Sequence, residues 1–106
     1  MGLFSFIADK GREMQEEILQ AQMRAEEWDN WDIMRAIKRT SKKTEIMGFV
    51  QALKNRAKTM SNSELERLYD EAYEGQNIRV ITMLGPIWEE HGVAYKDENG
   101  FYRKKR

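Results

Sequence analysis

The chain has 106 residues, of which 41% are hydrophobic and 34% are charged, and its acidic and basic side chains balance to a formal net charge of zero. This length and apolar content suit a single domain and exclude a disordered chain, which lacks the apolar groups that offset the loss of chain entropy. The lack of cysteine excludes disulfides and thiolate chemistry and is compatible with the cytoplasm, the compartment that we expect.

The segment of residues 1–28 is predicted to form one long helix that projects from the domain or mediates association. Gly11 weakens this helix by about 1 kcal/mol relative to alanine, which leaves the apolar cluster before it free to dock elsewhere. This cluster is too short to span a membrane, and no membrane contact is expected. The cluster consists of Leu3, Phe4, Phe6 and Ile7. These residues are the candidates for self-association, and packing inside the domain is the alternative. The helix face itself repeats at steps of four and three through Ile7, Gly11, Met14, Ile18, Ala21, Ala25 and Trp28.

A second helix is predicted to start at Asp29 or Asn30, because either side chain can accept hydrogen bonds from the free amide groups of a helix start. Trp31, Met34 and Ile37 are expected to face inward from it. All three tryptophans of the chain are most simply core residues, although the junction between the first two helices could leave one ring exposed.

Two further helices carry clear start and stop signals. The first has Thr44 as its expected N-cap. The second has Ser63 and Glu66 as an expected capping box and Gly75 at the position of a C-cap. The apolar face of the first helix recurs at Ile46, Val50, Leu53, Ala57 and Met60, and that of the second contains Leu65, Leu68, Tyr69 and Ala72.

The last helix is predicted from residues on one face, and a strand signal follows it. Gly85-Pro86 kinks or splits this helix, because proline lacks an amide donor and clashes with the preceding turn. Asn99-Gly100 is a typical hairpin turn. The face of the helix comprises Ile78, Ile81, Leu84 and Trp88.

The predicted fold is therefore mainly α: a single domain over residues 1–106, a small bundle of about five helices with a short C-terminal β-hairpin or ordered tail. Leu53, Leu68, Ile81 and Trp88 are expected in its core. The stretch "SELERLYDEAYEGQNIRVITMLGPIWEEHG" loosely resembles helical hairpins of small phage and mobile-element proteins. The resemblance implies an accessory role in a mobile element and carries no catalytic motif or functional residue.

Catalytic signatures are missing from the sequence. His91, the only histidine, lies next to two glutamates near a predicted helix end, where a cation also suits the helix dipole. An acidic cluster around Asp29 lacks the spacing and glycine of a calcium loop. No phosphate loop, nucleophile elbow or cysteine–histidine pair occurs. We therefore expect a protein that is not an enzyme and that holds no cofactor and no metal.

Charge is strongly segregated along the chain. The net charges are −5 for residues 1–34, +7 for 35–58, −6 for 59–98 and +4 for 99–106. If the second helix runs far enough, Arg35, Lys38, Arg39 and Lys42 share one of its faces, opposite Ile33 and Ile37. The candidate binding residues are Arg35, Lys38, Arg39, Lys42 and Lys43 with the tail Arg103, Lys104, Lys105 and Arg106.

Two functions follow from this pattern. The favoured one is a non-enzymatic helical interaction protein, acting through a protein partner or self-association. Its basic residues then pair, within one molecule or between subunits, with the acidic faces of the first helix and of Glu66, Asp70, Glu71 and Glu74. The alternative is a nucleic-acid-binding protein, in which the basic residues neutralise phosphates.

Overall fold

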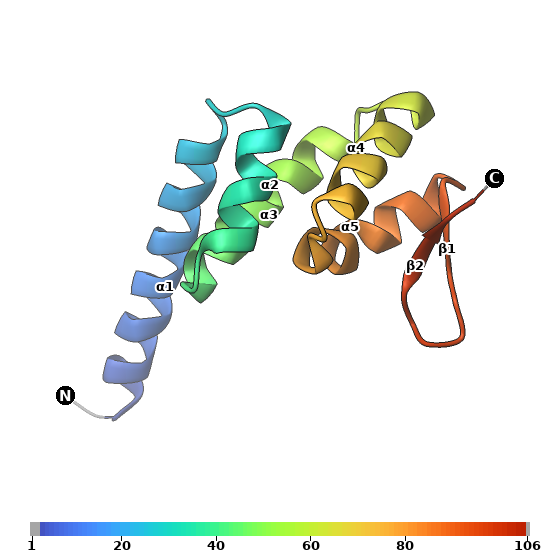
Figure 1. Ribbon diagram of the computed structural model, residues 1–106. Helices are drawn as coiled ribbons and strands as arrows, with labels where there is room; N and C mark the ends of the chain where they lie inside the picture. Colours follow the sequence, from blue (N-terminus) through green and yellow to red (C-terminus); the bar gives the residue numbers. More distant parts are fainter. Residues whose placement is uncertain (1–2, 106) are drawn as a thin grey trace.

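The computed structural model describes the backbone of residues 3–105 and the side chains from residue 11 onward (Figure 1). It confirms a mainly helical fold with a C-terminal hairpin. Its elements are α1 (Leu3–Ala25), α2 (Asn30–Arg39), α3 (Lys43–Ala57), α4 (Asn62–Glu74), α5 (Ile78–Glu90), β1 (Ala94–Lys96) and β2 (Tyr102–Lys104).

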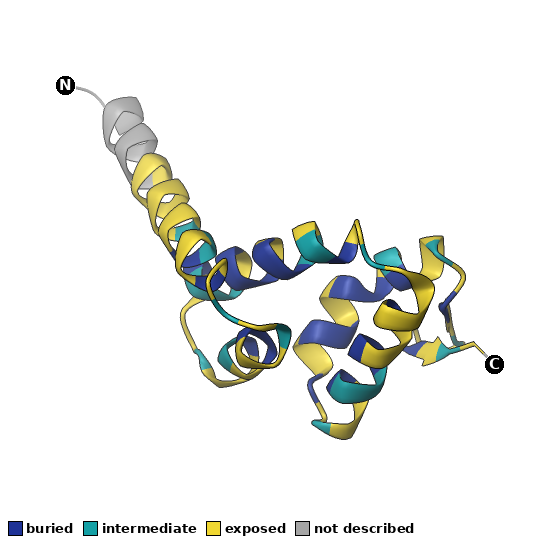
Figure 2. Ribbon diagram, turned by 90° about the horizontal axis from the view of Figure 1, so that it is seen from above, coloured by how far each residue is buried: buried dark blue, intermediate teal, exposed yellow. Residues whose placement is uncertain are grey.

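Helix α3 lies at the centre of the helical packing, with α1, α2 and α5 against it (Figure 2). Where α1 crosses it, the backbones approach so closely that a Cβ on Gly48 would lie 2.6 Å from the Cβ of Ala21 and 2.8 Å from the amide nitrogen of Gln22. Real Cβ atoms do not come this close to other atoms, so only glycine fits at this crossing.

A second part of the core joins α4, α5 and the hairpin. The rings of Tyr69 and Trp88 pack edge to face, with their centroids 5.1 Å apart. The Tyr69 hydroxyl donates a 2.7 Å hydrogen bond to the carbonyl of Tyr102, which ties α4 to β2. The Tyr102 ring covers Gly85, where it leaves no room for a side chain. Leu53, Leu68, Ile81 and Trp88 are all buried, as the sequence predicts.

The helix starts agree with the sequence in one case and differ in two. Asp29 is the N-cap of α2 and accepts a 2.8 Å hydrogen bond from the amide of Asp32, as predicted. Thr44 is not an N-cap: it is buried in the first turn of α3, and the cap position is Lys42, whose side chain makes no capping bond. The capping box of α4 begins two residues earlier than predicted, with Ser61 accepting from the amide of Glu64.

The predicted helix end at Gly75 and the hairpin turn are confirmed, whereas α1 ends at Ala25, three residues before Trp28, near which the sequence predicts its end. Gly75 is the C-cap of α4. Pro86 lies inside α5 without splitting it, because the amide that proline lacks would have bonded the carbonyl of the exposed Thr82. The hairpin forms around Gly100, whose φ of 81° requires glycine, and Asp97 accepts hydrogen bonds from two amides of the turn.

Two apolar residues expected to face inward are exposed instead. Trp31 is 46% exposed, because it lies six residues, or about 120°, from Ile37 around α2, beyond the edge of the buried face. Ile78 is 64% exposed, because it is the first residue of α5 and lies at the edge of that helix's buried face. The other two tryptophans do belong to the core. Trp88 is buried in it, and the partly buried Trp28 packs against the core cluster.

Replacing Leu53 by alanine should destabilise the fold by about 2–5 kcal/mol, because Leu53 is fully buried on the central helix and its loss leaves a cavity. Met47→Ala is the matched control, since Met47 is on the same helix and 50% exposed. Urea unfolding followed by circular dichroism measures both changes. Equal losses for the two variants would show that the core is elsewhere.

Candidate interaction surfaces

The predicted basic face of α2 is shorter than expected. Helix α2 ends at Arg39, and Thr40 is its C-cap, so the four residues do not form one continuous helix face. Lys42 and Lys43 belong instead to the start of α3. Arg35 and Arg39 do lie exposed on α2, opposite the buried Ile33 and Ile37.

Three basic side chains close the carboxyl ends of helices. The Lys38 ammonium donates a 2.6 Å hydrogen bond to the carbonyl of Gly75 at the end of α4. Arg79 donates to the carbonyls of Ile37 and Thr40 at the end of α2. Arg56 donates to the carbonyl of Ala25 at 3.1 Å, at the end of α1, and also to the next carbonyl. Cations suit these ends because the last carbonyls of a helix lack partners and carry negative partial charge.

The C-terminal basic residues form part of the hairpin and do not make a free tail. Arg103 pairs with Asp97 at 3.0 Å within the hairpin, and this guanidinium, helped by two backbone amides, lowers the pKa of Asp97. Lys104 pairs with Asp70 of α4, also at 3.0 Å. The amide of Lys105 continues the hairpin by bonding to the carbonyl of Val93, and Arg106 lies outside the described residues.

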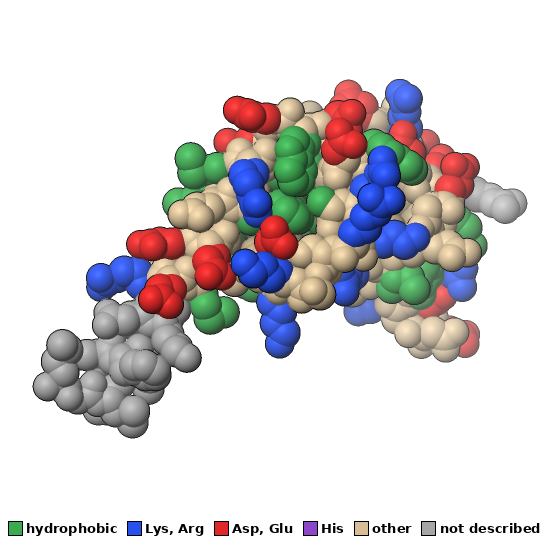
Figure 3. All heavy atoms as spheres, turned by 60° about the vertical axis from the view of Figure 1, so that its left-hand side comes forward, with side chains coloured by type: hydrophobic (Ala, Val, Ile, Leu, Met, Phe, Trp, Pro, Cys, Tyr) green, Lys and Arg blue, Asp and Glu red, His purple; other side chains and the backbone are tan. Residues whose placement is uncertain are grey.

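Within one chain, Arg35 and its neighbours make no ion pair with the acidic helix faces over residues 11–105, and pairing between subunits stays a prediction. Of the four α4 acids proposed as partners, Asp70 pairs with Lys104 and Glu71 with Arg67, both outside the predicted stripe. On the face drawn in Figure 3, hydrophobic, basic and acidic side chains lie next to one another. The surface is thus a mixture of apolar and charged groups and is not uniformly basic.

A groove of about 380 Å³, here called the α2–α4 groove, combines these apolar and basic groups. Met34 and Ala72 form its buried apolar part, and the exposed Trp31 stands beside them. Trp31, Arg35 and Lys38 are spaced i, i+4 and i+7, so they share one side of α2. This spacing can be read from the sequence, but Trp31 was not grouped with the two basic residues because it was predicted to face inward. The lining residues are Trp31, Met34, Arg35, Lys38, Arg39, Glu71, Ala72, Gly75 and Asn77.

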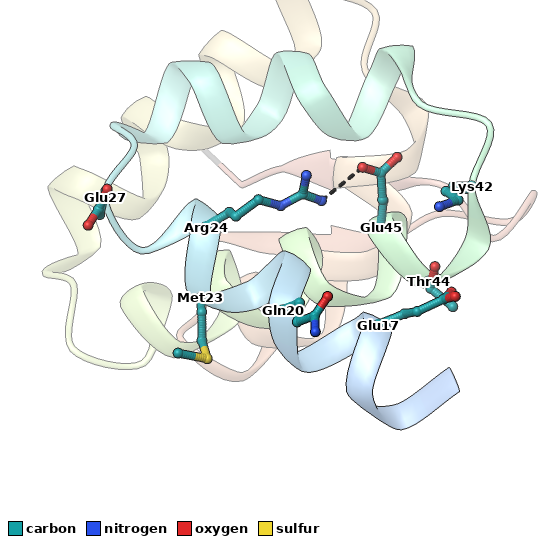
Figure 4. A pocket seen from close by; sticks show the side chains of 8 residues that line it. All are labelled: Glu17, Gln20, Met23, Arg24, Glu27, Lys42, Thr44 and Glu45. Carbon is teal, nitrogen blue, oxygen red and sulfur yellow. Dashed lines mark hydrogen bonds and ion pairs between the residues drawn. The ribbon is translucent and has the colours of Figure 1, made fainter. Parts of the chain in front are cut away.

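A second groove, of about 600 Å³, lies between α1 and the start of α3 (Figure 4). Arg24 of α1 bonds Glu45 of α3 at 2.9 Å, and the Thr40 hydroxyl donates to the same carboxylate at 2.7 Å. These hydrogen bonds, that of Thr40 foremost, lower the pKa of Glu45. The carboxylate is therefore engaged in holding α1 to α3.

The remaining features that the sequence raises are His91, metal sites, membrane spans and the N-terminal apolar cluster. His91 is the C-cap of α5 and is partly exposed. No group of histidine and acidic side chains suited to a metal ion occurs among the residues searched, from 11 to 105. Within the same limits, no helix combines the length and apolar content that crossing a membrane requires. The side chains of Leu3, Phe4, Phe6 and Ile7 lie outside the described residues.

Comparisons with known proteins found no match among family models, curated proteins or solved structures. The function therefore has to be argued from the surfaces of this chain alone.

The Glu45 contacts make the stability of the α1–α3 pairing depend on pH. A carboxylate whose pKa is lowered by folding stabilises the folded state at neutral pH, and this contribution is lost as the pH falls through the lowered pKa. Glu45→Gln should thus be less stable than the wild type at neutral pH, and the difference should shrink as the pH falls below the ordinary pKa of 4.5 and vanish below the lowered pKa. Urea unfolding at several pH values measures it, with Glu66→Gln as the exposed control. A difference that persists in acid would contradict an electrostatic role.

Proposed function

We propose that this chain is a non-enzymatic interaction protein that binds an acidic segment of a protein partner in the α2–α4 groove. The observation that carries the proposal is the exposure of Trp31 next to Arg35 and Arg39, at the mouth of an apolar hollow. Tryptophan and arginine are the residues that most often dominate the binding energy of protein interfaces. An exposed indole ring gains most when a partner covers it.

Charge defines the kind of partner. Helix α2 lines the groove with three basic side chains, whereas the facing α4 contributes one acid, Glu71. Over residues 11–105, Arg35 and Arg39 have no ion-pair partner, so both guanidinium groups are available to carboxylates of another molecule. A segment with an apolar side chain to cover Trp31 and acidic side chains beside it fits this arrangement.

The groove is held in shape by hydrogen bonds between its walls. Asn77, buried at the start of α5, donates from its amide to the carbonyl of Met34 at 2.7 Å, and Lys38 bonds the carbonyl of Gly75. These bonds fix α2 against the junction of α4 and α5. A preformed site loses little entropy on binding, which favours affinity.

Nucleic-acid binding is the second candidate function. It is favoured by Arg35, Arg39, Lys42 and Lys43, which are exposed and without ion-pair partners over residues 11–105. It is weakened by the engagement of Lys38, Arg103 and Lys104 within the fold. The accessory role in a mobile element stays a prediction.

Both candidates can be tested with purified protein. Peptides selected from a random library on the wild type should carry acidic residues next to an apolar one, and Trp31→Ala or Arg35→Glu should weaken their binding about tenfold or more. Fluorescence anisotropy of a labelled peptide measures the affinity. Lys58→Glu is the control, because it reverses an exposed charge at the end of α3, away from the residues that line the groove.

A titration with mixed-sequence DNA and RNA at two salt concentrations separates the second candidate. Binding to nucleic acid should weaken steeply with salt, and each lost phosphate contact should lower the log–log slope by roughly 0.9 for duplex DNA. Tight salt-dependent binding that Arg35→Glu weakens and Trp31→Ala does not would favour nucleic acid. Selected peptides without acidic residues, unaffected by either substitution, would overturn the groove proposal.

A further inference from the structure

Helix α1 extends beyond the helix that covers it. Among the larger contacts between elements, α1 packs on α3 alone. The start of α3 reaches only as far as Glu17, which lines the groove with Thr44 and Glu45. Residues 11–16 are all exposed, and Figures 1 and 2 show this end of α1 projecting away from the other elements.

The face of α1 that packs on α3 continues into the uncovered part. Ala21 and Ala25 are fully buried on this face, and Ile18 is partly buried. The preceding positions at the same alternating spacing are Met14, which is 49% exposed, and Gly11. The sequence extends the stripe with Ile7 and Phe4. Alternating steps of three and four are the pattern of a helix paired with another helix along its length, and α3 covers only the C-terminal part of this stripe.

Nothing in the described part of the chain packs against Gly11. A Cβ at this position would meet nothing within 4 Å, and glycine is a poor helix former. Gly48, in contrast, lies where α1 and α3 are too close for a side chain. Gly11 lies on the same stripe of α1 with open space in front of it. Its presence is explained if the backbone of another helix packs closely at this position.

We infer that the uncovered part of α1 pairs antiparallel with the same part of a second copy of this chain. The charged residues beside the stripe favour an antiparallel second copy as the partner. Lys10 and Glu17, one heptad apart, border the stripe on the same side. In an antiparallel two-fold pair that side of each helix meets the same side of the other, so Lys10 of each copy faces Glu17 of the other copy.

A parallel pair would not use these charges. It would place Lys10 and Glu17 opposite Gln15 and Gln22, which are neutral. Over residues 11–105, Glu17 has no ion-pair partner within the chain. The antiparallel copy therefore supplies both the apolar surface for Met14 and a partner for Glu17.

Two methionines on α1 give a matched pair of variants. Met14 and Met23 are both exposed, at 49% and 58%, and nine residues, or about 180°, separate them around the helix. In sedimentation velocity over a range of concentrations, the wild type should dimerise. Met14→Glu should weaken the dimer by about tenfold or more, because it places a charge in the apolar seam, and Met23→Glu should leave it unchanged. The chain lacking residues 1–8 should be a monomer.

Charge reversal tests the antiparallel arrangement separately. Lys10→Glu and Glu17→Lys should each weaken the dimer, and the double variant should restore it. Circular dichroism should show the same folded content in the Met14, Glu17 and Met23 variants, because these side chains are exposed. Trp31→Ala should dimerise normally, which keeps this proposal distinct from the groove. A monomeric wild type, equal effects at Met14 and Met23, or a double variant that stays weakened would overturn the inference.

Discussion

The close approach of α1 and α3 at Gly48 is the constraint on which the rest of the structure depends. Because glycine leaves no side chain between the helices, α1 packs closely against α3, and α2 and α5 also pack on α3. Leu53 then becomes fully buried near the middle of the molecule. The buried and partly buried residues of α1 all lie between residues 18 and 25, so the direction of the helix is fixed there, and residues 11–17 are exposed.

Helix ends impose the second constraint. Each helix leaves carbonyl groups without partners at its C-terminus, and a compact bundle buries several such ends close to other helices. In this chain Arg56, Arg79 and Lys38 each reach from one helix to the end of another. These contacts connect elements far apart in the sequence, and they explain why a run of basic residues is only partly available to a ligand. Basic residues near helix junctions can therefore be structural even when their spacing looks like a binding stripe.

The sequence predicted the helices, the hairpin and the deepest core residues, because hydrophobic period and turn chemistry are local signals. The sequence did not predict which side chains are buried where burial depends on the neighbouring elements that pack against a helix. The period places Trp31 near a buried face, but only the packing of α2 on α3 and α5 decides that Ile33, Met34 and Ile37 go inward and the indole stays out. The stripe of basic residues was predicted as one unit because the end of α2 at Arg39 has no glycine or proline to mark it.

Electrostatics in this fold act over short distances, and this shapes what its surfaces can recognise. Arg24 is one of the few basic residues of the acidic segment 1–34, and Glu45 is the only acidic residue of the basic segment 35–58. Their ion pair therefore does not reduce the excess charge of either segment. Lys104 and Asp70 instead neutralise two majority charges. With zero net charge and a screening length of about 8 Å at physiological salt, the remaining guanidinium groups of α2 attract a ligand only from nearby. Long-range steering of a polyanion is therefore weak, and recognition at the α2–α4 groove has to draw on direct contact with Trp31 as well as on charge.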